Sequence, residues 1–124
     1  MGYVLRRQLR EALGPDVTGL QRAVALEIAD DANDVTRESW AGLEDLVRWT
    51  AAKGERVVRT TLGRLAEAGW EFRVPIGKDK FGNPVYASRG HRLTFRVPLF
   101  DVPKGTTTVS PFEVEGTTTV GPQP

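Results

Sequence analysis

Hydrophobic residues recur every three or four positions in four stretches of the first half of the chain, a spacing typical of amphipathic helices. The pattern predicts helices over residues 3–13, 18–31, 40–50 and 54–68. Gly14-Pro15 ends the first helix, and Thr18 is a candidate N-cap for the second. We therefore expect an N-terminal amphipathic helix within residues 1–14, which either docks on the rest of the chain or forms a homodimer through residues 1–13.

Beyond Gly69, the expected end of the fourth helix, the hydrophobic period changes from about 3.6 residues to two. Alternating apolar and polar residues predict strands over 70–76 and 92–97, and residues 85–87 are a candidate return strand. Residues 77–84, between the first strand and the return strand, are rich in turn-forming residues. We therefore expect a β-hairpin, or a three-stranded ribbon, with a basic tip.

The last segment, residues 101–124, has the composition of a disordered tail. Thirteen of its residues are Gly, Pro or Thr, and apolar residues are sparse. The pentapeptide Gly-Thr-Thr-Thr-Val occurs twice in it, at 105–109 and 116–120. Two interpretations of the repeat remain open. It is either a linear motif for a protein partner or, the favoured interpretation, a linker produced by duplication.

The composition narrows the class of protein without indicating a function. The 124 residues fit one domain, and the absence of cysteine excludes disulfides, thiolate metal sites and cysteine nucleophiles. The longest apolar runs are far shorter than the roughly 20 residues needed to cross a bilayer. Residues 3–13 also lack the continuous apolar segment of a signal peptide. We expect a cytoplasmic protein without membrane contact.

The net charge of +1 conceals an uneven distribution along the chain. Residues 11–52 carry three bases and nine acids, whereas residues 53–97 carry ten bases and four acids. The net charges of these two blocks are therefore −6 and +6. Such an asymmetry indicates an anionic partner for the basic block, and it makes the acidic block a candidate surface for a different partner.

The order helix, helix, short turn, helix and hairpin over residues 15–100 is that of a winged helix-turn-helix, an α+β fold. In this fold the last helix enters the major groove of double-stranded DNA, and the hairpin, or wing, lies along the backbone. The expected core face of that recognition helix is Val58, Thr61, Leu62, Leu65 and Ala68. Its candidate DNA contacts are Glu55, Arg56, Arg59, Thr60, Gly63 and Arg64. The candidate contacts from the wing and nearby turns are Lys53, Lys78, Lys80, Arg89 and Arg92.

Arginine at the start of a recognition helix is suited to base recognition, because a guanidinium group donates two hydrogen bonds to guanine O6 and N7. Arg56 and Arg59 are the candidates for this role. The alternative for each is a solvated or ion-paired surface residue, and Glu55 and Arg59 have the i,i+4 spacing of an ion pair. The lysines of the hairpin would neutralise phosphates without specifying a sequence.

The segment 42–70 combines a leucine, a short turn, an arginine-rich helix and a closing acid-alanine-glycine-aromatic run. Its matching positions are Leu46, Arg56, Val58, Arg59, Leu62, Leu65, Glu67, Ala68, Gly69 and Trp70. On these positions the chain resembles, over residues 18–98, the helix-turn-helix domain proteins of actinobacteria and phages. The resemblance implies a nucleoid-associated DNA-binding protein, either a transcriptional regulator or a replication initiator. The turn at 51–54 is one residue longer than the form usual in that group.

Catalysis is not expected, because the sequence offers no Gly-rich phosphate loop, no nucleophile elbow and only one histidine, His91. No cofactor and no metal are expected, and the polar run 30–34 is interpreted as a solvated helix end. Trp40, Trp49 and Trp70 are expected in the core or at its edge. The alternative to DNA binding is a winged-helix module that docks on proteins through its acidic half and its repeated tail.

Overall fold

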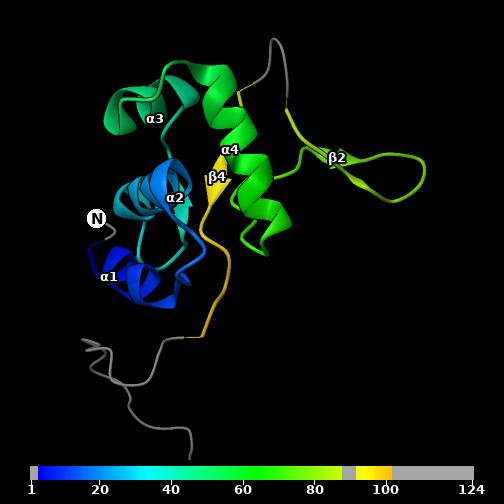
Figure 1. Ribbon diagram of the computed structural model, residues 1–124. Coiled ribbons are helices and arrows are strands. Elements are labelled where there is room, and N and C mark those ends of the chain that lie inside the picture. The colour runs from blue at the N-terminus through cyan, green and yellow to red at the C-terminus, as the bar shows by residue number, and fades with distance from the viewer. Residues whose placement is uncertain (1–2, 88–91, 102–124) are drawn as a thin grey trace, which may run out of the picture.

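The computed structural model describes residues 3–87 and 92–101, so Arg89, His91 and the two repeats lie outside the described residues. Within that part, the chain is a small α+β fold with four helices and two small antiparallel sheets (Figure 1). Its helices are α1 (Tyr3–Ala12), α2 (Gly19–Asp31), α3 (Leu43–Thr50) and α4 (Glu55–Glu67). Its strands are β1 (Glu38–Ser39), β2 (Gly77–Lys78), β3 (Pro84–Val85) and β4 (Phe95–Arg96). No described helix is long and apolar enough to cross a membrane.

The helix α2 is the centre of the helical part, because it contacts α1, α3 and α4. Its buried residues Val24 and Ile28 belong to one core cluster with Leu46 of α3 and Leu62 of α4. The amphipathic spacing predicted from the sequence supplies the apolar side chains for this cluster. Thr18 precedes α2 as expected, although its side chain makes no capping hydrogen bond.

The apolar face of α1 is buried inside the chain itself. Leu5, Leu9 and Leu13 belong to the same core cluster as the other helices. The Asp34 carboxylate accepts a hydrogen bond from the Leu5 amide at 3.1 Å, which occupies one of the free donors at the start of α1. Of the two expectations for residues 1–13, docking is therefore the one found. A homodimer through residues 1–13 stays a prediction.

The strand β4 lies between two partners that are far apart in the sequence. It pairs antiparallel with β1, with Ser39 opposite Phe95. On its other side, Arg73 forms an isolated bridge to Phe95, and the Arg96 amide donates to the Phe72 carbonyl at 2.8 Å. The expected strand over 70–76 is thus reduced to this bridge. The pairing of β1 was not predicted, because its segment lacks an alternating hydrophobic pattern.

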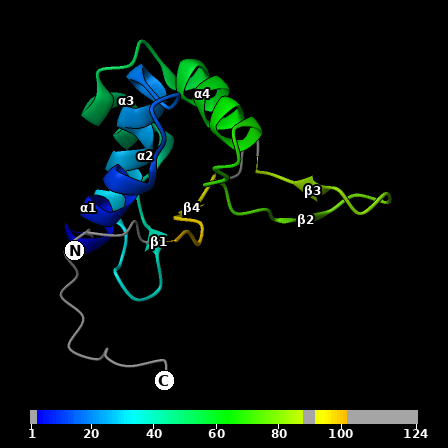
Figure 2. The ribbon, with the colours of Figure 1, turned by 60° about the horizontal axis from the view of Figure 1, so that its bottom comes forward.

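The hairpin formed by β2 and β3 projects away from the helices in both views (Figures 1 and 2). Its register pairs Gly77 with Val85 and Lys78 with Pro84. The paired residues lie inside the segment that the sequence assigned to a turn-rich tip. The hairpin is therefore confirmed, but its strands are shorter and closer to the tip than expected.

The start of α3 differs from the expected position near residue 40. The Asp45 carboxylate accepts a hydrogen bond from the Gly42 amide at 2.9 Å, so the helix is capped at Gly42 and begins at Leu43. Trp40 is left outside the helix with 76% of its surface exposed, which makes the core assignment of this tryptophan wrong. Ala68, expected in the core, is also exposed, because α4 ends at Glu67.

Candidate functional site

The helix α4 has one buried and one exposed face. Its buried face consists of Val58, Thr61, Leu62 and Leu65, as the helical spacing predicted. The exposed face carries Arg56, Thr60 and Glu67, with Gly63 half-buried between them. A Cβ atom added to Gly63 would meet nothing within 4 Å, so close approach within the fold does not require glycine there. Apart from Gly63, the residues of this face are exposed.

One flank of this exposed face adjoins the base of the hairpin. The Arg59 guanidinium donates a hydrogen bond to the Ala87 carbonyl at 3.4 Å, and Arg59 is half-buried as a result. The ion pair with Glu55 that the spacing allowed is not formed among the described residues. Arg59 therefore links α4 to the residues that follow β3.

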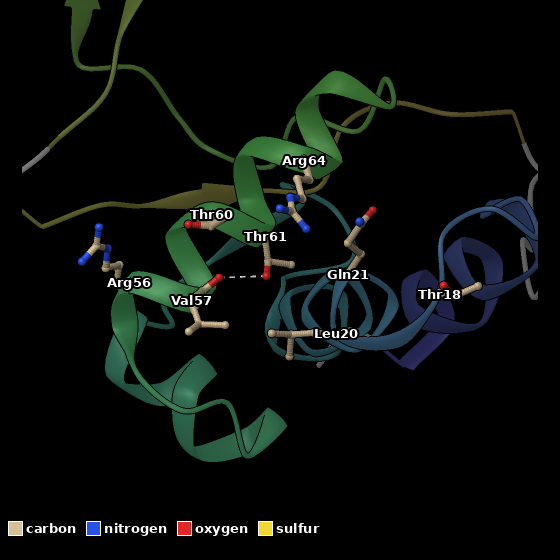
Figure 3. Close-up of a pocket in the computed structure, with 8 residues that line it drawn as sticks. All are labelled: Thr18, Leu20, Gln21, Arg56, Val57, Thr60, Thr61 and Arg64. Carbon is tan, nitrogen blue, oxygen red and sulfur yellow. Dashed lines mark hydrogen bonds between the residues drawn. The ribbon is translucent and has the colours of Figure 1, made fainter.

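The other flank borders a groove of about 440 Å³ between α4 and the start of α2. Its lining residues are Thr18, Leu20, Gln21, Arg56, Val57, Thr60, Thr61 and Arg64. Arg64 extends over the groove toward Gln21, whereas Arg56 and Thr60 point outward from α4 (Figure 3). The Thr61 hydroxyl donates back to the Val57 carbonyl at 2.8 Å, so it is already satisfied within the helix.

Most arginine side chains in the described part of the chain form hydrogen bonds or ion pairs with other groups of the protein. Arg22 donates to the carbonyls of Arg10, Gly14 and Val17, which lie at and just beyond the end of α1. Arg37 similarly donates to backbone carbonyls near β4. By contrast, the guanidinium groups of Arg56 and Arg64 make no hydrogen bond and no ion pair within the described residues. Two guanidinium groups are thus free to bind a ligand at the exposed face of α4.

The connection between α3 and α4 is the four-residue segment expected from the sequence, residues 51–54. Ala51 closes α3 in the left-handed conformation, with φ of 59°, and its amide donates to the Val47 carbonyl. Lys53 is exposed in this connection, next to the start of α4. Its ammonium group therefore lies at the same end of α4 as Arg56.

A cluster of three side chains fixes the base of the hairpin. The Glu71 carboxylate accepts hydrogen bonds from the Arg73 guanidinium at 2.8 and 2.9 Å and from the Tyr86 hydroxyl at 2.9 Å. The Arg73 guanidinium also lies over the Tyr86 ring, 4.2 Å from its centroid. Burial alone would raise the pKa of Glu71, but the hydrogen bonds from Arg73 and Tyr86 together outweigh it and lower the pKa.

This cluster makes part of the stability dependent on pH. Because the folded pKa of Glu71 lies below its ordinary value of 4.5, its contribution is complete above that pH and is lost as the pH falls through the folded pKa. We expect the free energy of unfolding of Glu71→Gln to fall less steeply between pH 5 and pH 3 than that of the original protein. Urea unfolding at each pH measures the slope, with exposed Glu67→Gln as the control. Equal slopes for Glu71→Gln and the original protein would contradict this assignment.

The tip of the hairpin carries Lys78 and Lys80, both exposed as expected. Asp79 organises the tip, because its carboxylate accepts hydrogen bonds from the amides of Phe81 at 2.8 Å and Asn83 at 2.9 Å. The hydrogen bond from the Asn83 amide outweighs desolvation, so the pKa of Asp79 lies below its ordinary value. Phe81 is exposed beside the two lysines.

Arg92, a candidate backbone contact, is occupied in a different way. Its guanidinium donates to the Trp40 carbonyl at 2.5 Å, so it holds the loop before α3. That loop is also held by Asp31, which accepts from the Ser39 hydroxyl and from the Trp40 amide. The polar run that ends α2 therefore organises the loop, although it was expected to be only a solvated helix end.

Three groups of residues at the site were not found from the sequence. Leu20 and Gln21 line the groove because the start of α2 packs beside α4, a contact that no local pattern signals. Phe81 could have been found from the sequence, because it is an aromatic residue flanked by lysine and glycine within a turn-rich segment. The hairpin-base cluster depends on a pairing across the hairpin, between Glu71 and Tyr86.

The described residues contain no group of three His, Cys, Asp or Glu side chains placed to hold a metal ion. The chemistry of the site is instead that of free guanidinium groups, hydroxyls and a basic hairpin beside one exposed helix face.

Comparison with protein-family models, with curated protein sequences and with solved structures finds no match for this chain.

Proposed function

We propose that this chain binds double-stranded DNA, with the exposed face of α4 in the major groove. The observation that carries the proposal is that Arg56 and Arg64, both exposed on α4, have guanidinium groups with no partner among residues 3–87 and 92–101. A buried or paired arginine has little to offer a ligand, whereas a free guanidinium group on a helix can bind guanine edges or phosphates. Because Arg56 points outward from α4, it is the candidate for base contact (Figure 3).

The topology supports the same proposal. The α4 face is flanked on one side by the start of α2 and on the other by the β2–β3 hairpin, to which Arg59 connects it. In this proposal α3 and α4 are the two helices of a helix-turn-helix, and the hairpin is its wing. Strand β4 pairs with β1 on one side and is bridged on the other side by Arg73, in the segment that leads from α4 to the hairpin.

The roles of the remaining site residues follow from their positions. Lys53, Arg64, Lys78 and Lys80 are exposed around the α4 face, where they are suited to phosphate contacts. Arg59 acts mainly by fixing the hairpin relative to α4, and Thr60 adds a hydroxyl at the centre of the exposed face. Transcriptional regulation and replication initiation are the two biological roles that this type of DNA binding would serve.

The test is the salt dependence of binding to a mixed-sequence duplex, measured by fluorescence anisotropy. If four basic side chains neutralise phosphates, the affinity should fall about 100-fold between 50 and 200 mM salt. A Lys78→Ala/Lys80→Ala variant should bind more weakly and show a shallower slope, because it releases fewer counterions. No binding at low salt, or an affinity that does not change with the salt concentration, would refute the proposal and favour docking on a protein instead.

A further inference from the structure

Phe81 is a large apolar residue at the exposed tip of the hairpin, outside the core cluster. It lies in the turn between β2 and β3, and 77% of its surface is exposed. The Lys80 ammonium lies 5.2 Å from the centroid of its ring, and Lys78 is exposed on the same hairpin. The tip thus presents an aromatic ring together with two positive charges.

The backbone of this tip is held firmly. Asp79 accepts hydrogen bonds from the amides of Phe81 and Asn83, and the Asp79 amide donates to the Asn83 carbonyl at 2.9 Å. Gly82 has φ of 83°, a conformation that L side chains rarely adopt, and its amide closes the turn onto the Asp79 carbonyl at 3.0 Å. A held backbone reduces the entropy that Phe81 loses when it inserts into a partner.

The hairpin is long enough to reach the groove next to the one that α4 occupies. Arg59 fixes its base to α4 at Ala87, six residues beyond Phe81. Phe81 and Gly82 belong to the turn, so the extended part of this segment is residues 84–87, which spans roughly 13 Å. The turn and the Phe81 side chain add to this length, and half a turn of B-DNA, the distance from a major groove to the adjacent minor groove, is about 17 Å.

We propose that Phe81 is a wedge that the hairpin inserts between two base pairs from the minor groove, so that the protein bends the DNA it binds. This inference rests on the proposed function. The ring partly unstacks one base step, while Lys78 and Lys80 bind the phosphates on either side of it. Flexible pyrimidine–purine steps are the preferred targets, because they unstack at the lowest cost in free energy.

The experiment uses the full chain and a duplex selected from a random library, with a fluorescence donor and acceptor at its ends. In a second set of duplexes, 2-aminopurine replaces one adenine at a time at the TA and CA steps. Binding of the original protein should raise both the energy transfer between the ends and the fluorescence at one step. Phe81→Ala should lose both signals and bind roughly fivefold to tenfold more weakly.

Two further variants make the result specific to the wedge. Phe81→Leu should retain a reduced form of both signals, because leucine also serves as a wedge. Leu99→Ala removes an apolar side chain that is 87% exposed elsewhere, and it should change neither signal. Since Phe81 packs against no core residue, Phe81→Ala should melt at the same temperature as the original protein by circular dichroism.

Each outcome decides the inference. Binding without a bend and without increased 2-aminopurine fluorescence, or equal signals from Phe81→Ala and the original protein, overturns the wedge and leaves DNA binding intact. No binding of the original protein to any duplex overturns the proposed function and the wedge with it.

Discussion

Replacing Arg56 with alanine is expected to weaken binding to a selected DNA site by about 5–150-fold, the range for one bidentate contact to a guanine. Arg56 projects from the exposed face of α4 and has no partner among the described residues, so its loss leaves the fold unchanged (Figure 3). Affinity for a scrambled duplex should change much less, because phosphate contacts elsewhere remain. Parallel titrations of both duplexes measure the difference.

The control for this prediction is Arg7→Ala, which removes the same charge from an exposed position on α1. The Arg7 guanidinium donates a hydrogen bond to the Tyr3 hydroxyl at 3.0 Å and lies over the Tyr3 ring. If Arg7→Ala and Arg56→Ala reduced the affinity equally for both duplexes, the effect would come from net charge alone. Arg56 would then not contact a base, although binding to phosphates would still stand.

Replacing Phe72 with alanine is expected to destabilise the fold by about 3–5 kcal/mol, the usual cost of truncating a buried phenylalanine. Phe72 is fully buried, its ring stacks near that of Trp70 at 6.5 Å between centroids, and its carbonyl accepts the Arg96 amide. It therefore joins the end of α4 to β4. A loss of this size is a large fraction of the 5–15 kcal/mol that stabilises an ordinary domain.

Urea unfolding followed by circular dichroism measures this loss, and Phe81→Ala is the matched control. The two variants undergo the same chemical change, but Phe72 is buried and Phe81 is exposed. Phe81→Ala should change the free energy of unfolding by less than about 0.5 kcal/mol. Similar losses for both variants would show that Phe72 does not hold the sheet against the helices.

The helical part of the fold was predictable from the sequence because its information is local. Apolar residues at helical spacing gave α1, α2 and α4 with bounds correct to within two residues. The same spacing assigned the buried and exposed faces of α4, and hence placed Arg56 and Arg64 at its surface. The exception is α3, whose start is set by a hydrogen bond that the Gly42 amide donates to the Asp45 carboxylate.

The sheets were less predictable, because their strands are short and their partners are distant. A two-residue strand such as β1 exists only because β4 supplies its hydrogen-bond partners from more than fifty residues away. The alternation over 70–76 predicted a strand, but the segment forms only the isolated bridge from Arg73 to Phe95 and the backbone hydrogen bonds around it. Strand length depends on pairing, and pairing is a property of the tertiary structure.

In the candidate site, too, some features follow from the local sequence and others from the tertiary structure. The sequence by itself determined which residues α4 exposes, because the 3.6-residue period fixes side-chain direction as soon as the helix forms. Only the tertiary structure decided which arginines remain available: Arg59 and Arg92 are held by the carbonyls of Ala87 and Trp40, while Arg56 has no partner in the described chain. Those carbonyls come from segments 28 and 52 residues away, and chain folding alone brings them within hydrogen-bond distance.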